Sequence, residues 1–134
     1  MGETTDSSLP LRAEQDVVLG RQTVRRLTQE LGFSLVDQTK MVTAASELAR
    51  NTVTYGGGGV MRWEVLERER RRGLRLEFED QGPGIPDLNL ALKDGWTSGK
   101  GLGMGLSGAR RLVNEFEIDS QVGIGTRVTI TRWR

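Results

Sequence analysis

The sequence predicts one α+β domain, a two-layer sandwich in which three long helices cover one face of a mixed, largely antiparallel sheet. Three observations lead to this prediction. Apolar residues recur every three or four positions in three segments, as they do on the buried face of a helix. Between those segments apolar and polar residues alternate, as they do in strands with one buried face. The 134 residues, 36% of them hydrophobic, are enough for one compact core.

The first part of the chain is expected to hold a tail, an edge strand and a helix. Residues 1–8 are polar and are predicted to form a flexible tail, so that the folded domain spans residues 9–134. Residues 9–14 alternate in polarity like a short edge strand. Asp16 is the expected N-cap of the helix, and Gly32 is its expected stop. The apolar stripe of this helix comprises Val17, Gly20, Val24, Leu27 and Leu31.

A second helix is predicted from about Ser34 to Tyr55. Its buried face comprises Met41, Val42, Ala45, Leu48, Ala49 and Val53. At about 100° per residue, Glu47 and Asn51 lie one turn apart on the border of that face and point the same way. The glycines at 56–59 end the helix.

The remaining elements follow from the same two periods. Strands are predicted at 60–67, 74–80, 117–122 and 126–133, a short helix at 88–93, a loop at 96–105 and a third long helix from Leu106 to Phe116. Asp80 has the inward parity of Leu74, Leu76 and Phe78, and it ends its strand just before a turn. Its carboxylate is therefore expected on the covered face.

Composition narrows the function. The chain has no cysteine and no histidine, which removes thiol chemistry and the commonest general base, so carboxylates must carry any acid–base work. Phosphoryl transfer with Mg²⁺ needs only oxygen ligands and a carboxylate. The net charge of +1 gives no reason to expect binding to nucleic acid or to an anionic membrane. Without a secretory signal or an apolar run of about 20 residues, a cytoplasmic protein is expected.

Two short motifs contain candidate site residues. Glu47 and Asn51 offer a carboxylate and an amide oxygen on one helical turn, a partial Mg²⁺ site with a carboxylate free to orient a hydroxyl. On its own this spacing is common on a polar helix border. Asp80, in Asp-x-Gly-x-Gly, offers an acceptor for an exocyclic amine, with Gly82 and Gly84 letting a planar base approach the backbone. The alternative is a strand end followed by turn glycines.

A glycine-rich loop and a second glycine turn complete the pattern. The segment 101–105 opens a helix, where backbone N–H groups bind phosphate without a charged side chain. Lys100, Thr97 and Ser98 are candidates for further phosphate contacts, or are simply solvated loop residues. Gly-x-Gly-Thr at 123–126 is by itself an ordinary β-turn, so the information lies in the order of all four motifs.

That order resembles the N box and the three glycine boxes of the GHKL, or Bergerat-fold, ATPases. The resemblance covers about residues 10–134. It implies a catalytic or water-orienting role for Glu47, an Mg²⁺ ligand at Asn51, an adenine contact at Asp80 with Gly82 and Gly84, and a supporting adenine contact at Thr126. It also implies that the glycine loop closes over the ATP phosphates. The loop residues assigned to ATP on this basis are Lys100, Gly101, Leu102, Gly103, Met104 and Gly105.

Within that superfamily the motifs look most like the RsbT-type switch kinases of the stressosome. The segments that carry this likeness are residues 46–51, 80–85, 105–108 and 110–116. It implies phosphorylation of serine or threonine on STAS-domain partners, and activation of a PP2C-type phosphatase by the released kinase. The absence of histidine argues against a histidine kinase that phosphorylates itself. An anti-sigma factor with serine kinase activity, a nucleotide-gated binding module and a plain ATPase remain alternatives, and homodimer formation stays open.

Two further features have a structural and a functional interpretation. The run Arg68–Arg72 is either a solvated hairpin tip or a docking patch for an acidic partner. Trp63, Trp96 and Trp133 are candidates for partner contacts, although Trp133 fits a strand residue packed at the sheet edge.

Overall fold

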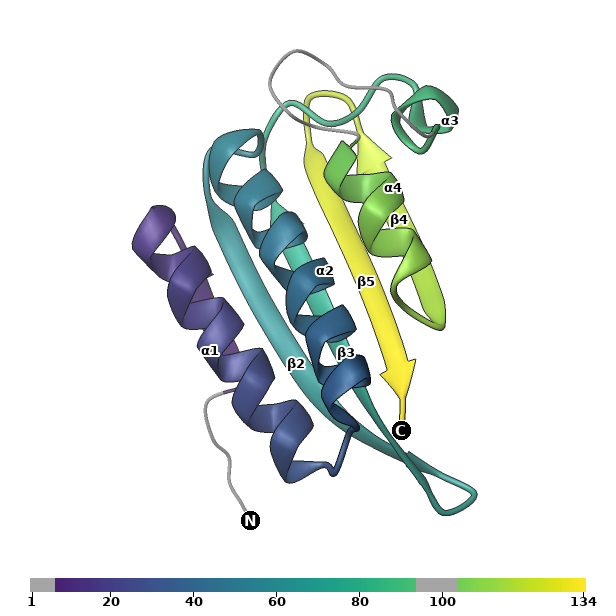
Figure 1. Cartoon of the computed structure of the whole chain (residues 1–134). Coiled ribbons are helices and arrows are strands. Elements are labelled where there is room, and N and C mark those ends of the chain that lie inside the picture. The colour runs from purple at the N-terminus through teal and green to yellow at the C-terminus, as the bar shows by residue number, and fades with distance from the viewer. Residues whose placement is uncertain (1–6, 94–103) are drawn as a thin grey trace.

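The computed structural model describes residues 7–93 and 104–134, which form a five-stranded sheet with helices on one face (Figure 1). The strands are β1 (Ser8–Leu11), β2 (Gly59–Arg68), β3 (Arg71–Asp80), β4 (Glu115–Gln121) and β5 (Gly125–Trp133). The helices are α1 (Glu14–Glu30), α2 (Leu35–Thr54), α3 (Leu88–Ala91) and α4 (Met104–Arg111). The predicted α+β class with two layers is confirmed.

The sheet has the strand order β1-β2-β3-β5-β4, and every neighbouring pair is antiparallel. No parallel pair occurs among the described strands, so the predicted mixed sheet is wrong in that detail. The central strand β3 ends with Asp80 paired to Gly59 on one side and to Thr126 on the other. The register therefore brings the glycine turn after α2 and the start of β5 to the same end of the sheet.

The start of α1 differs from the prediction. Ala13 is the N-cap, and Asp16 lies three residues further on. Its carboxylate accepts hydrogen bonds from the backbone N–H groups of Arg12 and Ala13 at 2.7 and 3.0 Å, so it stabilises the helix start from inside the first turn. The strand before it begins at Ser8, which the prediction had placed in the tail.

The end of α1 and the start of α2 are as predicted. Gly32 follows the C-cap of α1 with φ +80°, a conformation that glycine adopts without a Cβ penalty. Ser34 caps α2, and its side chain accepts a hydrogen bond from the N–H of Asp37 at 3.1 Å.

The predicted third long helix is wrong, because α4 ends at Arg111. Asn114 donates its backbone N–H to the carbonyl of Thr131, and its side chain accepts from the N–H of Trp133, which aligns the chain with β5. Phe116 therefore belongs to β4, although its spacing also fits the apolar stripe of a longer helix. Only α1 and α2 are long helices in the described part of the chain.

The core lies between the helical layer and the sheet. In Figure 1, α2 lies between α1 and α4 and runs across the middle of the sheet. On the sheet, the buried face of α2 packs mainly against β3 and β2. The innermost large side chains include Leu11, Met41, Leu48, Met61, Leu74, Leu76, Leu106 and Ile130.

Candidate active site

The candidate site begins on α2, where the structure places Glu47 and Asn51 one turn apart. The Glu47 side chain is 43% exposed, and its Oε1 lies 3.9 Å from Nη1 of Arg50. Arg50 also lies 3.4 Å from Glu14 on α1, so it bridges the two helices beside Glu47. The side-chain nitrogen of Asn51 is buried and has no hydrogen-bond partner among the residues that the structure describes. Leaving a buried amide nitrogen without a hydrogen bond costs free energy, so such groups are rare in folded proteins. One that lines a pocket is a candidate contact for a ligand.

The first turn of α4 lies directly against these two side chains. A Cβ added at Gly105 would be 2.9 Å from Nδ2 of Asn51 and 3.3 Å from Oε2 of Glu47. Glycine therefore lets the start of α4 approach the two polar groups on α2. The structure thus brings together the end of the glycine-rich segment and the Glu47–Asn51 pair.

Asp80 lies at the end of β3 with its side chain half-buried. Its Oδ1 accepts the backbone N–H of Gly82 at 2.9 Å. Burial raises the pKa of the Asp80 carboxyl, and the negative charge of Glu79 adds to the rise, whereas backbone hydrogen bonds from Gly82 and Thr126 oppose it. The result is a partly desolvated carboxylate that can accept a hydrogen bond from a ligand.

Gly82 and Gly84 lie against backbone from other parts of the chain. A Cβ on Gly82 would lie 2.7 Å from the carbonyl oxygen of Gly56, and one on Gly84 would meet the backbone of Gln121. Gly84 also has φ +78°. Both glycines are therefore required for close packing of backbone on backbone, and the space they leave is filled by the protein. Gly56 in turn lies against Asp80, where a Cβ would be 2.4 Å from Cγ.

A pocket lies between α2, α4 and this end of the sheet. Its lining combines polar groups with apolar side chains: Leu48, Asn51, Thr52, Tyr55, Phe78, Asp80, Ile85, Leu106, Thr126 and Val128. Asn51, Asp80 and Thr126 are the predicted site residues among them, whereas Gly82 and Gly84 do not line it. The free volume is about 20 Å³, room for about one water molecule, so a larger ligand must widen the pocket as it enters.

The sequence profile of the "Histidine kinase-, DNA gyrase B-, and HSP90-like ATPase" family matches residues 36–133. The chain belongs to this ATPase family. Membership implies ATP binding, and it agrees with a pocket that lies between the half-buried carboxylate of Asp80 and the start of α4.

Among relatives of this ATPase domain, the chain is 42% identical to the serine/threonine-protein kinase RsbT of Bacillus subtilis, over 95% of this chain and 96% of the relative. It is 27% identical to the anti-sigma F factor of Clostridium kluyveri, over 88% of this chain and 86% of that factor. A crystal structure of the RsbU and RsbW domains of a Mycobacterium tuberculosis protein has the same fold, with a TM-score of 0.62 at 21% identity. That match covers 96% of this chain and 33% of the other.

Two residues that support the candidate site were not predicted. Tyr55 donates its hydroxyl to the carbonyl of Gly84 at 3.1 Å and so fixes the turn after Asp80. Its position four residues after Asn51, on the same helical face, is a signal that could have identified it. Ser120 accepts the N–H of Ile85 at 2.8 Å and lies 2.7 Å from the Thr126 hydroxyl. A serine at an inward position of β4, among apolar neighbours, is the corresponding signal.

Several of the predicted phosphate-binding residues lie outside the described part of the chain. They are Lys100, Gly101, Leu102 and Gly103, and the further candidates Thr97, Ser98 and Trp96 lie outside it as well. Met104 and Gly105 open α4. Among the residues that are described, no group of three or more acidic, histidine or cysteine side chains is arranged to hold a metal ion. No helix within 7–93 or 104–134 has the length and apolar character needed to cross a bilayer.

Proposed function

We propose that this chain is an ATP-dependent protein serine/threonine kinase of the RsbT type. The observation that carries the proposal is the position of a half-exposed carboxylate, Glu47, beside Asn51 and the first turn of α4. The 42% identity to a serine/threonine-protein kinase over nearly the full length of both chains supports the same activity.

ATP is proposed to bind with its base in the pocket under α2. The carboxylate of Asp80 accepts a hydrogen bond from the exocyclic amine of adenine. A base with a keto oxygen in place of that amine could not donate this hydrogen bond. Thr126, held by Ser120, supports that contact. The phosphates then lie toward the start of α4, where unpaired backbone N–H groups and the helix dipole favour negative charge. Gly105 and the residues before it, from Lys100, are the proposed phosphate-binding segment.

Glu47 is proposed to accept the proton of the substrate hydroxyl as the γ-phosphoryl group is transferred to it. The leaving group is ADP, so one phosphoanhydride bond breaks and one phosphate ester forms. Glu47 is exposed enough to meet a protein substrate, and Arg50 fixes it from one side. Most of the rate enhancement in such a site comes from orientation and charge stabilisation.

The site has features that fit Mg²⁺. The Asn51 side chain presents a buried amide without a partner toward the pocket, and turning that amide presents its oxygen instead. Mg²⁺ prefers oxygen ligands and is usually held by one or two protein groups together with substrate phosphates. Asn51 would hold the ion, which supplies charge neutralisation at the phosphates.

The proposed protein substrates are STAS-domain proteins of the stressosome, with a PP2C-type phosphatase as the partner activated by the released kinase. Similarity to RsbT supports this choice. The likeness to anti-sigma F factors supports a second candidate, an anti-sigma factor that phosphorylates its STAS-domain antagonist. Co-purification of an RNA polymerase sigma subunit with this protein, and of no phosphatase, would decide for that second function.

The test uses Glu47→Gln, labelled ATP, Mg²⁺ and STAS-domain proteins of the same organism. The variant is expected to bind ATP with unchanged affinity and to lose phosphotransfer by about 100-fold or more. Glu14→Gln is the matched control, because Glu14 contacts the same Arg50 yet lies on α1, and it should retain activity. Normal phosphotransfer by Glu47→Gln would falsify the assignment of the base.

A further inference from the structure

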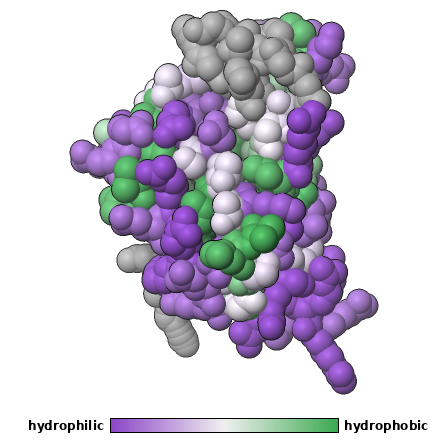
Figure 2. All heavy atoms as spheres, viewed as in Figure 1, coloured by the Kyte–Doolittle hydropathy of each residue, from purple (hydrophilic) through white to green (hydrophobic). Residues whose placement is uncertain are grey.

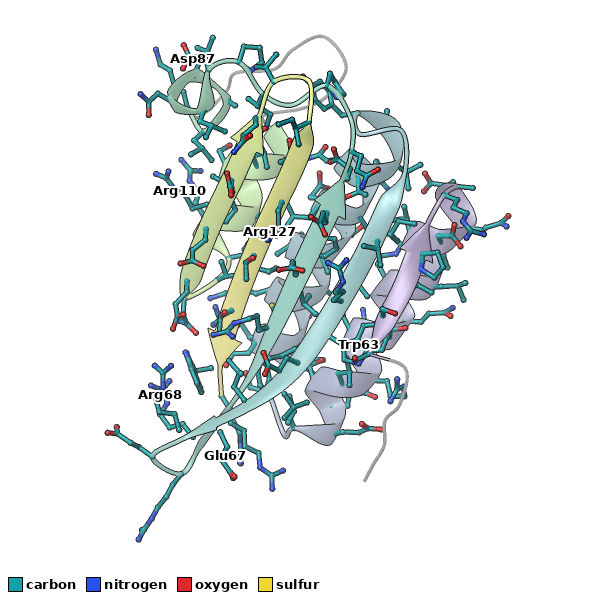
Figure 3. All side chains as sticks on the ribbon, turned by 180° about the vertical axis from the view of Figure 1, so that it is seen from behind. Trp63, Glu67, Arg68, Asp87, Arg110 and Arg127 are labelled. Atoms are coloured by element: carbon teal, nitrogen blue, oxygen red, sulfur yellow. The ribbon has the colours of Figure 1, made fainter. Side chains whose placement is uncertain are left out.

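The hairpin between β2 and β3 projects beyond the rest of the sheet. Gly73 of β3 pairs with Trp133, and the two residues of β3 before Gly73 pair only with β2 among the described strands. The last residues of β2 likewise pair only with β3. Figure 1 shows the hairpin extending past the end of β5, at the opposite end of the molecule from the α3 side. Figure 3 places Glu67 and Arg68 at this free end and Asp87 at the other.

The hairpin carries arginines that are not neutralised. Arg68, Arg70, Arg71 and Arg72 are all exposed, and none of them forms an ion pair with a described residue. The glutamates at 67 and 69 make no ion pair with them. Figure 2 shows hydrophilic residues gathered over this region.

Arginines elsewhere on the sheet behave differently. Arg62 lies 2.6 Å from Glu77, Arg75 lies 3.3 Å from Glu64, and Arg127 lies 3.6 Å from Asp119. The outer face of the sheet therefore pairs its cations internally. The contrast means that the hairpin charge is a local feature, and it leaves donors available for carboxylates outside this chain.

Two of these arginines are held in place by a tryptophan. The guanidinium carbons of Arg68 and Arg71 lie 4.9 and 5.8 Å from the centre of the Trp133 ring. The ring is nearly buried, and its Nε1 donates to Glu115 at 3.0 Å. Gly73 makes room for it, because a Cβ there would lie 2.7 Å from the ring. Stacking fixes a guanidinium without consuming its in-plane N–H donors.

The tip itself has an unusual backbone. Glu69 and Arg70 have φ values of +52° and +71°, in a two-residue turn that ordinarily favours asparagine and glycine. Charged residues at these positions cost stability, and such a cost often accompanies a functional requirement.

We propose that Arg68, Arg70, Arg71 and Arg72, two of them positioned by Trp133, form a docking surface for a protein partner whose own surface is rich in Asp and Glu. We call it the arginine hairpin. It lies at the other end of α2 and the sheet from Asp80 and Asn51, so a partner bound there leaves the nucleotide pocket open. Binding at the arginine hairpin is therefore independent of ATP, which separates this proposal from the proposed kinase activity.

The test measures binding of a fluorescein-labelled polyglutamate peptide by fluorescence anisotropy, with and without ATP. The double variant Arg70→Glu/Arg72→Glu should weaken binding by about tenfold or more. The control Arg12→Glu/Arg26→Glu makes the same change in net charge at two exposed residues, one just before α1 and one on it, and should stay within about twofold. Arg68→Lys/Arg71→Lys keeps the charge and loses the stacked forks, and it should weaken binding about fivefold. Saturating ATP should leave all these affinities unchanged.

Several results would overturn the proposal. If the wild-type protein did not bind the peptide, there would be no such docking surface. Equal losses in both glutamate variants would mean that binding depends only on net charge. Duplex DNA and vesicles of phosphatidylserine serve as competitors beside unlabelled peptide. If either displaced the labelled peptide at a lower concentration than unlabelled peptide does, the arginine hairpin would bind another class of partner. The thermal unfolding midpoint of each variant checks that the fold is kept. It should stay close to that of the wild type, because the changed side chains are exposed.

Discussion

The hydroxyl of Tyr55 donates a hydrogen bond to the carbonyl oxygen of Gly84, 3.1 Å away, and this bond links the end of α2 to the turn after Asp80. Tyr55 also lines the pocket with Asp80, so the turn and the pocket wall are fixed by one side chain. Both groups are partly buried, and water replaces the bond poorly.

Tyr55→Phe tests that link. The change removes only the hydroxyl, and we expect a loss of about 1 kcal/mol, seen as ATP affinity about fivefold weaker by isothermal titration calorimetry. Thr23→Val is the control, because it removes a hydrogen bond from an exposed hydroxyl to the carbonyl of Leu19 on α1, away from the pocket. Equal losses of affinity in the two variants would contradict a specific role for Tyr55.

Asp80→Asn should separate affinity from stability. Because the pKa of the Asp80 carboxyl is raised in the folded state, ionisation of this group opposes folding once the pH rises above its unfolded pKa. A neutral amide is free of that cost, so the nucleotide-free variant should unfold at a temperature no lower than the wild type at pH 7, with the advantage disappearing at acid pH. ATP affinity should nevertheless fall about tenfold or more, since the charged acceptor is lost.

The control for Asp80 is its neighbour Glu79, which points to the opposite face and pairs with Arg62 at 3.0 Å. Glu79→Gln should leave ATP affinity within about twofold of wild type. If Asp80→Asn bound ATP as tightly as this control does, the adenine contact would have to be assigned elsewhere.

Local periodicity predicted the directions of side chains better than it predicted the element boundaries. The spacing of Glu47 and Asn51 fixes their common direction on any helix, and the parity of Asp80 fixes its side of the sheet. Phe116, in contrast, fits both a longer helix and the start of β4, and the choice depends on hydrogen bonds between Asn114 and β5 that no local pattern contains.

The glycines show the same limit. At positions 82 and 84 the sequence predicted glycines that let a planar base approach the backbone, and in the structure other backbone of this chain approaches both positions. The sequence could not indicate which backbone this is. The answer depends on Gly56 and Gln121, which are 26 and 37 residues away in the chain and meet these glycines only in the folded sheet.

The ion pair between Asp37 and Arg132 should control acid stability. Arg132 Nη2 lies 2.6 Å from Oδ1 of Asp37, its Nη1 donates to the carbonyl of Leu112, and its side chain is only 14% exposed. The hydrogen bond from Arg132 is the main reason that the pKa of the Asp37 carboxyl is lowered, with further help from its charge. Stability from this carboxylate is therefore present above its unfolded pKa and is lost as the pH falls through the folded pKa.

Asp37→Asn should cost about 2 kcal/mol in the free energy of unfolding at pH 7, because it leaves a nearly buried guanidinium uncompensated. Urea unfolding at a series of pH values measures this, and the gap between variant and wild type should narrow below about pH 4. Asp119→Asn breaks an exposed pair with Arg127 and should cost less than about 1 kcal/mol. A gap that stays constant down to low pH would show that the cost does not come from the charge of Asp37.

Gly105→Ala should damage catalysis without unfolding the protein. The added methyl group would lie 2.9 Å from Nδ2 of Asn51 and 3.3 Å from Oε2 of Glu47, so α4 or one of these side chains must move. A displacement of a few tenths of an ångström to about 1 Å at a catalytic group can cost up to about 100-fold in rate, and we expect at least a tenfold loss of phosphotransfer.

The same helix supplies the control, since a Cβ added at Gly108 would have no atom of the described residues within 4 Å. Gly108→Ala should raise helix stability by up to about 1 kcal/mol and leave phosphotransfer unchanged. Kinase assays and thermal unfolding of both variants separate the two effects: parallel behaviour of the two glycines would mean that the contact of Gly105 with Glu47 and Asn51 has no catalytic consequence.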